Sequence, residues 1–219
     1  MTLPFSPEAF VALFAQYNSA IWPAQIAAGA AGLLVLAAAL RPFRGGGRLA
    51  AGLLAALWLW TGIVYHGQFF ATLSFFAPGF ALIFVVQGAL FVWTGFRRGG
   101  LAFRASGIAG RTGVLLMIYA LAIYPLTGWL AGHVWLALPA FGVTPGPLTL
   151  FTMGALLAVD GRTPWHLVVL PVAWSLVGGS AVWLLGMTED IALPLAGVGG
   201  AALIALKNGR IRRDAIPAA

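Results

Sequence analysis

The sequence predicts an all-α protein, a polytopic transmembrane helix bundle of about seven spans with its N-terminus outside and its C-terminus in the cytoplasm. Three observations predict this fold. Only 8% of the 219 residues are charged and 61% are hydrophobic, whereas soluble domains carry about 25% charged residues. The apolar residues form runs of spanning length, and every Lys and Arg follows an alternate run. One integral membrane domain, residues 1–219, accounts for the chain.

Residues 1–20 are predicted to form an interfacial helix that leads into the first span. Ser6, Pro7 and Glu8 supply a helix cap, a proline at the first helical position and an acid in the first turn. Large apolar residues then recur at helical spacing: Phe10, Leu13, Phe14 and Tyr17. No Lys or Arg precedes Tyr17, so the basic region of a cleavable signal peptide is missing.

The apolar runs and the charges between them define the predicted topology. The spans are expected at about residues 21–40, 49–69, 75–96, 113–130, 134–159, 164–187 and 191–206. The loops after the first, third and fifth spans and the basic tail, residues 207–219, hold every Lys and Arg. Because basic residues stay on the cytoplasmic side, this alternation predicts an outside N-terminus and a cytoplasmic tail.

The fifth predicted span is broken at Pro145-Gly146-Pro147. A proline lacks an amide donor and disfavours helix in the residue before it, so no regular helix runs through both prolines. Irregular backbone survives at membrane depth only inside protein or beside a water-filled cavity. Two interpretations stay open. A half-helix starts within the bilayer, where its free amides favour an anion or a carbonyl oxygen, or a helix starts at the outer surface.

Two histidines, His66 and His133, are expected at the outer ends of outward-running spans. Such a pair can share a metal ion, with Glu189 or Asp190 as a carboxylate partner, or hold a haem from two sides. The alternative is that each is an interfacial histidine bonded to backbone or water. Neither HxxxH nor HExxH spacing is present, so no sequence motif selects the metal site.

Several function classes lack their parts. The net charge of +7 comes from clusters between apolar spans, not from a solvated basic face, which excludes a nucleic-acid partner. The absence of cysteine removes thiolate metal sites and cysteine nucleophiles. No acid lies within a predicted span, so a carboxylate proton relay or a sodium-coupled carrier lacks its parts. The single lysine, Lys207, lies at the end of the last span and not at its middle, which disfavours a retinal Schiff base. A membrane enzyme is disfavoured because no nucleophile–base pair is recognisable.

Four stretches resemble a bacterial family of multi-span membrane proteins, domain of unknown function 6064. They are residues 13–25 (LFAQYNSAIWPAQ), 58–70 (WLWTGIVYHGQFF), 87–95 (QGALFVWTG) and 124–154 (YPLTGWLAGH through FGVTPGPLTLFTMG). The resemblance implies a multi-pass protein of the bacterial inner (plasma) membrane and no particular reaction. Members often carry a cysteine between the two prolines of the break, where this chain has Gly146.

The resemblance also marks a set of positions, most of which the predicted topology places near the outer leaflet. They are Tyr17, Asn18, Trp22, Pro23, Gln25, His66, His133, Pro145, Pro147 and Thr152. The first functional hypothesis is therefore an outward-facing polar pocket that binds or transports a small ligand or metal ion. Its expected lining is Tyr17, Asn18, Gln25, His66, Gln68, His133, Gly146, Thr149 and Thr152.

The second hypothesis needs no pocket. Lipid-facing helices can pack on other membrane subunits, so the chain is then an accessory or anchoring subunit of a larger complex. In both hypotheses the lipid bilayer is the main partner. The nature of the ligand and the oligomeric state do not follow from the sequence.

Overall fold

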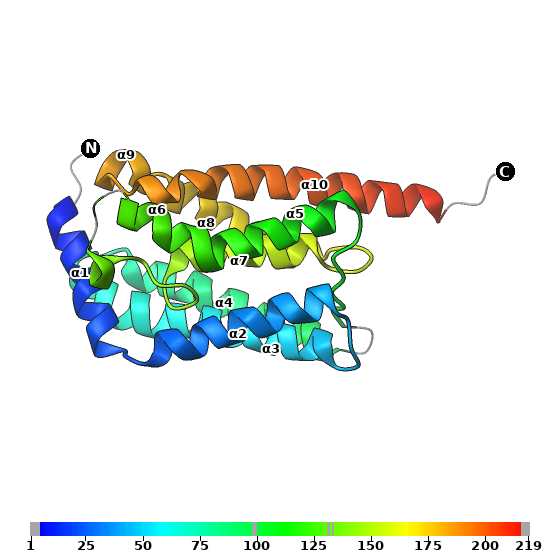
Figure 1. The fold of residues 1–219 in the computed structure, drawn as a ribbon, viewed down its shortest axis with the longest axis horizontal. Coiled ribbons are helices and arrows are strands. Elements are labelled where there is room, and N and C mark those ends of the chain that lie inside the picture. Colours follow the sequence, from blue (N-terminus) through cyan, green and yellow to red (C-terminus); the bar gives the residue numbers. More distant parts are fainter. Residues whose placement is uncertain (1–4, 98–99, 131, 133, 216–219) are drawn as a thin grey trace.

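The chain folds into a bundle of long helices with one helix laid across its end (Figure 1). The computed structural model describes residues 5–97, 100–130, 132 and 134–215. The described residues contain no strand beyond an isolated bridge between Phe103 and Val159. The α-helices are α1 (Pro7–Ala20), α2 (Ala24–Leu40), α3 (Gly46–Trp60), α4 (Ala77–Phe96), α5 (Gly107–Ile118), α6 (Tyr124–Leu130), α7 (Pro145–Leu157), α8 (Val169–Gly179), α9 (Ala181–Leu185) and α10 (Ala192–Asp214).

Five continuous helical segments of the described chain are long and apolar enough to cross a membrane. They are Gly46–Thr72, Ala77–Phe96, Gly107–Leu130, Trp165–Leu185 and Ala192–Asp214. A sixth is obtained if α1 and α2, which meet at 88°, are counted together. The predicted all-α class is confirmed, and α7 is apolar but shorter than a spanning helix.

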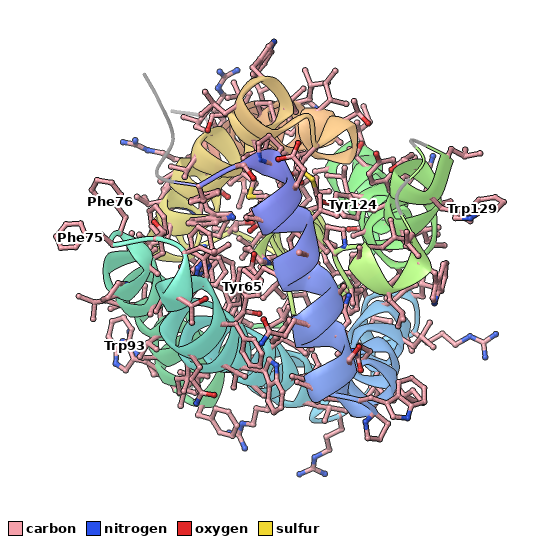
Figure 2. All side chains as sticks on the ribbon, turned by 90° about the vertical axis from the view of Figure 1, so that its left-hand side faces the viewer. Tyr65, Phe75, Phe76, Trp93, Tyr124 and Trp129 are labelled. Atoms are coloured by element: carbon pink, nitrogen blue, oxygen red, sulfur yellow. The ribbon has the colours of Figure 1, made fainter. Side chains whose placement is uncertain are left out.

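Helix α1 lies across one end of the bundle, which is called the α1 end below (Figure 2). Ser6 caps it by accepting a hydrogen bond from the Ala9 amide at 3.2 Å. The same hydroxyl is hydrogen-bonded to Glu8, and this contact lowers the pKa of that exposed carboxyl. The chain turns sharply into α2 at a cis Trp22–Pro23 peptide bond.

Two of the long segments contain a stretch of π-helix, in which the turns are wider than in an α-helix. Helix α3 continues as π-helix over Thr61–Phe69, and α5 passes through π-helix at Tyr119–Ile123 into α6. Pro125 explains the second stretch, since a proline cannot donate to the preceding turn. Such stretches occur often at functional sites because they change which side chains face inward.

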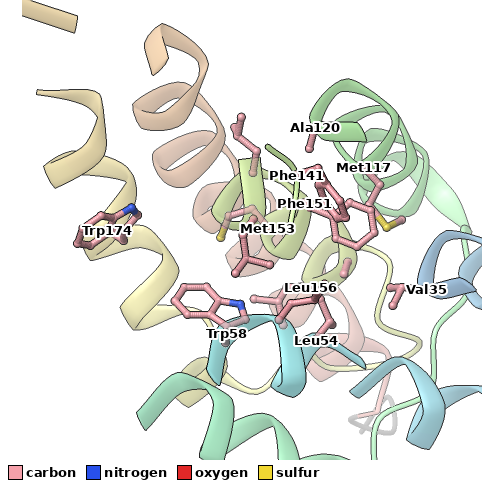
Figure 3. Close-up of a cluster of buried hydrophobic side chains, with 14 of the residues drawn as sticks. Val35, Leu54, Trp58, Met117, Ala120, Phe141, Phe151, Met153, Leu156 and Trp174 are labelled. Carbon is pink, nitrogen blue, oxygen red and sulfur yellow. The ribbon is translucent and has the colours of Figure 1, made fainter. Parts of the chain in front are cut away.

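Helix α7 forms the centre of the bundle. Every residue from Gly146 to Leu157 is buried, and large side chains from several helices pack around it (Figure 3). Its closest neighbour is α5, where two glycines meet. A Cβ added at Gly154 would lie 2.5 Å from the Gly113 carbonyl oxygen, and one at Gly113 would lie 2.3 Å from that of Gly154. The absence of side chains at these positions therefore sets the distance between the two helices.

An irregular segment, residues 134–144, leads from the α1 end to the start of α7. Three of its backbone carbonyls accept hydrogen bonds from side chains of α1. Asn18 donates from Nδ2 to the carbonyls of Leu136 and Leu138, both at 2.8 Å. The Tyr17 hydroxyl donates to the Val143 carbonyl at 2.7 Å. These bonds satisfy buried carbonyl groups that would otherwise each cost several kcal/mol in an apolar environment.

The opposite end of the bundle is called the basic end. The loops after α2, α4 and α7 meet there, because Ala105 donates its amide to Ala39 and Asp160 donates to Ala102. All the Lys and Arg residues that the structure describes lie in these loops or in the adjoining turns of α3, α5 and α10. Residues 134–157, an irregular stretch and a short helix, therefore run from the α1 end to the basic end.

Substituting Gly154 with alanine is expected to destabilise the protein by about 1–3 kcal/mol, because the new methyl group forces α5 and α7 apart. Thermal or SDS-induced unfolding of the detergent-solubilised protein measures the effect. Gly199→Ala in α10 is the matched control, since a Cβ there meets nothing within 4 Å. Equal stability of the two variants would contradict the close contact.

Candidate functional site

A cavity of about 220 Å³ lies at the α1 end, bounded by α1 on one side and by the start of α7 on the other. Most of its lining is aromatic or aliphatic, and it is called the aromatic cavity below. The aromatic residues that line it are Phe5, Phe10, Phe14, Tyr65, Phe70, Phe76, Phe80, Tyr124 and Trp174. Among them lie polar residues, His66, Asp190, Ser74 and Ser180, and the glycine at the start of α7, Gly146.

His66 is the residue of this cavity whose environment is hardest to explain by packing. Its side chain is 1% exposed, and neither ring nitrogen has a hydrogen-bond partner. A neutral imidazole carries one donor and one acceptor, so both capacities are unused. Leaving a buried donor or acceptor unpaired costs about 1–3 kcal/mol. Because His66 lines a cavity, a bound molecule can supply the missing hydrogen-bond partner and remove this free-energy cost.

Aromatic rings surround the imidazole. The ring centroids of Phe84, Trp174 and Tyr65 lie 4.7, 5.0 and 5.0 Å from that of His66. Phe70 and Phe80 follow at 5.8 Å each. The π-helical stretch places Tyr65 and His66 side by side with both side chains buried. Five aromatic rings therefore enclose the imidazole, and the nearest three belong to Phe84, Trp174 and Tyr65.

Trp174 adds a second unpaired donor to the same wall. It lies on α8, and its buried Nε1 has no hydrogen-bond partner. An indole nitrogen only donates, whereas a neutral imidazole both donates and accepts. A molecule that carries a carbonyl, ether or hydroxyl oxygen therefore matches this wall, and the remainder of that molecule must be apolar to suit the other lining residues.

A carboxylate lies at the start of α7. Tyr124 donates a short hydrogen bond from its hydroxyl to Asp190. A Cβ at Gly146 would lie 2.6 Å from that hydroxyl and 2.8 Å from Asp190 Oδ1, so the absence of a side chain lets both approach the helix start. A negative charge is stabilised at a helix N-terminus. Whether this start is a half-helix within the bilayer or a helix start at the outer surface stays a prediction, and in either case Asp190 lies beside it.

The exposed part of the cavity rim is apolar. Phe76 at the beginning of α4, Val177 on α8 and Leu184 on α9 line the cavity and are 63%, 45% and 46% exposed. Figure 2 shows Phe75 and Phe76 at the periphery of the bundle, while Tyr65 and Tyr124 lie further in, behind α1. A ligand that enters between α4 and the α8–α9 segment therefore passes apolar side chains.

The residues predicted from the sequence are distributed over several places. His66 and Gly146 line the aromatic cavity. Asn18 and Gln25 line a separate groove of about 590 Å³ between α1, α2 and the segment after α6. Gln68 is exposed. Thr149 and Thr152 are buried in α7, where Thr152 accepts a hydrogen bond from Trp58 at 2.9 Å and the Thr149 hydroxyl has no partner.

The hydroxyl of Tyr17 is engaged in hydrogen bonds within the protein. It is buried, donates to the Val143 carbonyl and accepts from Trp60 Nε1 at 3.0 Å. Burial raises the pKa of its phenol, and the hydrogen bond from Trp60 offsets part of that rise. Together with Asn18 it holds the irregular segment before α7, while the Gln25 side chain donates to the Asn18 carbonyl at 2.8 Å.

The predicted metal or haem pair stays a prediction. His133 and the side chain of Glu189 lie outside the described residues. Within the part that is described, no three His, Cys, Asp or Glu side chains are grouped so that they can hold a metal ion. His166, the third histidine, lies near the basic end, where its Nε2 is 2.8 Å from Thr94 Oγ1.

Three lining residues, Tyr65, Tyr124 and Trp174, are not predicted as members of the site by the sequence. Tyr124 follows one π-helical stretch and Tyr65 lies within another, and neither stretch is visible in the apolar pattern. Trp174 lies mid-helix in a run that is apolar on all sides. The proline at position 125 is the one local signal that an inward-facing residue lies beside it.

The described residues form an all-helical protein with five or six segments that are apolar enough to span a membrane. An aromatic cavity lies at one end of this bundle. The comparison with family models is more specific. The model described as "Family of unknown function (DUF6064)" matches residues 7–215, and the chain belongs to this family. No curated protein and no solved structure matches the chain.

Replacing His66 with phenylalanine is expected to raise the stability of the ligand-free protein by about 1–3 kcal/mol, because two buried unpaired nitrogens are replaced by an apolar edge. SDS-induced unfolding of protein that has been cleared of bound small molecules measures it. His166→Phe is the control, because that ring has a hydrogen-bond partner and should gain nothing. A destabilised His66→Phe protein would indicate a partner for the imidazole within the chain.

Proposed function

We propose that this protein is an integral membrane protein that binds a small, mostly apolar molecule in the aromatic cavity. The observation that carries the proposal is the buried imidazole of His66, which lines the cavity and has no partner on either nitrogen. The unpaired Nε1 of Trp174 supports it. The ligand is a lipophilic molecule with one oxygen-bearing polar group, which hydrogen-bonds to these side chains.

The proposed location is the bacterial inner membrane, with seven traversals. The support comes from the five or six apolar helical segments and from the segment 134–157, which runs between the two ends although its helical part is short. Basic residues gather at the end opposite α1, so the rule for positive loops places that end in the cytoplasm and α1 outside. Helix α1 then lies at the outer interface and covers the cavity.

Single cysteines test this topology, since the natural chain has none. Thr72→Cys at the α1 end is expected to react with a membrane-impermeant maleimide in intact cells. Ser106→Cys at the basic end is expected to react only after the membrane is opened. Both positions are exposed in the structure. Labelling of the two variants on the same side would overturn the proposed arrangement.

The small molecules that co-purify with the protein test the proposed binding at the aromatic cavity. Organic extraction of the wild-type protein, followed by mass spectrometry, is expected to recover a small lipophilic molecule. His66→Phe and Trp174→Phe each remove a hydrogen-bonding group and are expected to lower its amount about tenfold, which corresponds to about 1.4 kcal/mol of binding free energy.

Gln68→Ala is the matched control, because Gln68 lies on the same helical segment as His66 but is exposed. It should retain the molecule at the wild-type level. Equal content in all four proteins would refute binding at the aromatic cavity.

The alternative function is that of an accessory subunit in a larger membrane complex. The specific support is a groove between α5 and α10 that is lined almost entirely by apolar and small residues. Such small-residue surfaces let another helix approach closely in a membrane. Recovery of a stoichiometric partner after mild solubilisation, with no extractable small molecule, would favour this alternative.

A further inference from the structure

A second cavity, of about 300 Å³, lies at the basic end, between the end of α4 and the segment that joins α7 to α8. It is far from α1 and shares no lining residue with the aromatic cavity. Its side chains include Arg97 from the end of α4, Arg162 and His166 from the joining segment, and Thr94. The lining is thus basic and polar, in contrast to that of the aromatic cavity.

Trp93 lies against two of the side chains of this cavity, Arg97 and His166. The Arg97 guanidinium lies 4.6 Å from the centroid of the Trp93 ring, and the His166 ring lies 5.4 Å from it. The hydrogen bond between His166 and Thr94 fixes the imidazole further. Because stacking on an aromatic ring limits the freedom of a guanidinium group, Arg97 loses little additional entropy when it binds an anion.

The charge balance of the cavity favours an anion. Asp160 is the acid among the lining residues, and its carboxylate forms an ion pair with Arg104 at 3.3 Å. No second acid is among the lining residues to neutralise the charges of Arg97 and Arg162. Guanidinium groups match the oxygens of a phosphate in both charge and geometry. A phosphoryl group is therefore the ligand chemistry that suits this cavity.

The surface beside the cavity indicates where the rest of the ligand lies. Leu82, Val86 and Trp93 on α4 are all exposed, and their spacing of four and seven residues puts them on one face of the helix. Arg97 follows directly after the last residue of α4, and its guanidinium lies over the Trp93 ring. In Figure 2 the labelled Trp93 points outward from the bundle. An exposed apolar face that ends at a basic cavity fits a phospholipid, with its acyl chains on the helix.

We propose that this basic cavity binds the phosphate headgroup of an anionic phospholipid, whose acyl chains lie along the exposed face of α4. Basic pockets between transmembrane helices are a recurrent way of holding such headgroups. The inference rests on the proposed membrane location, but it is independent of the aromatic cavity and of any ligand bound there.

Native mass spectrometry of the full-length protein in detergent tests the proposal with defined probes. Phosphatidylglycerol, phosphatidylcholine and inorganic phosphate are titrated separately. The wild-type protein is expected to retain phosphatidylglycerol at least about tenfold better than phosphatidylcholine, because each basic residue near a lipid phosphate adds measurably to affinity. The double variant Arg97→Gln/Arg162→Gln is expected to lose this preference.

The control is Arg44→Gln/Arg111→Gln, which removes the same charge from the same end at two exposed positions outside the cavity. It should keep the preference for phosphatidylglycerol. Equal losses in the two double variants would overturn the proposal, since net charge alone would then explain binding. Full occupancy by inorganic phosphate, with no added retention of the lipid, would overturn the lipid assignment.

Circular dichroism and size-exclusion chromatography verify that both double variants are folded. The single variant His166→Ala provides a further measurement if the double variant Arg97→Gln/Arg162→Gln does not fold. It leaves both guanidinium groups in place but removes the ring that packs on Trp93, so a severalfold loss of phosphatidylglycerol retention is expected. Wild-type retention in His166→Ala would contradict the organised cavity.

Discussion

The rest of the structure depends on one constraint, the need to satisfy the backbone carbonyls of the irregular segment before α7. Apart from a single 3₁₀ turn at Trp135–Ala137, this segment enters an apolar bundle without regular helix, so several of its carbonyls need donors from elsewhere. Asn18 and Tyr17 on α1 supply three of the hydrogen bonds. The position of α1 across the bundle end follows from these bonds, and so does the cavity that α1 bounds.

Several polar side chains in the centre of the bundle have hydrogen-bond partners, so the unpaired groups at the aromatic cavity need an explanation. Trp58 is bonded to Thr152, Gln87 donates to the Leu167 carbonyl, and Asp190 accepts from Tyr124. Other buried polar atoms also lack a partner, among them the Thr149 hydroxyl within α7, but the unpaired nitrogens of His66 and Trp174 belong to two residues that line the same cavity. The two ends of the molecule thus differ in chemistry, with a largely apolar cavity beneath α1 and a basic cavity between the end of α4 and the segment that joins α7 to α8.

Part of the site could be predicted from local sequence. The polar residues of α1, and His66 in the segment Gly46–Thr72, stand out in an apolar chain. In the structure the former bond to a distant segment and the latter lines the aromatic cavity. The sequence could not tell which of these residues line a cavity and which bond to the backbone of another segment. Tyr17 and Asn18 bond to carbonyls more than 100 positions away, at Val143 and Leu136, and no local pattern identifies such a partner. Tyr65, Tyr124 and Trp174 were missed because an aromatic residue in an apolar helix resembles ordinary packing.

The sequence by itself determined the all-helical class, the gathering of basic residues on alternate loops and the inability of Pro145 and Pro147 to lie within one regular helix. These properties follow from composition and from the covalent structure of single residues. Only the tertiary structure decided that Asp190 lies beside the start of α7 and that His66 is enclosed by rings from α4 and α8. The physical reason is that hydrogen bonding and burial depend on which segments meet in space, and these segments are distant in the chain.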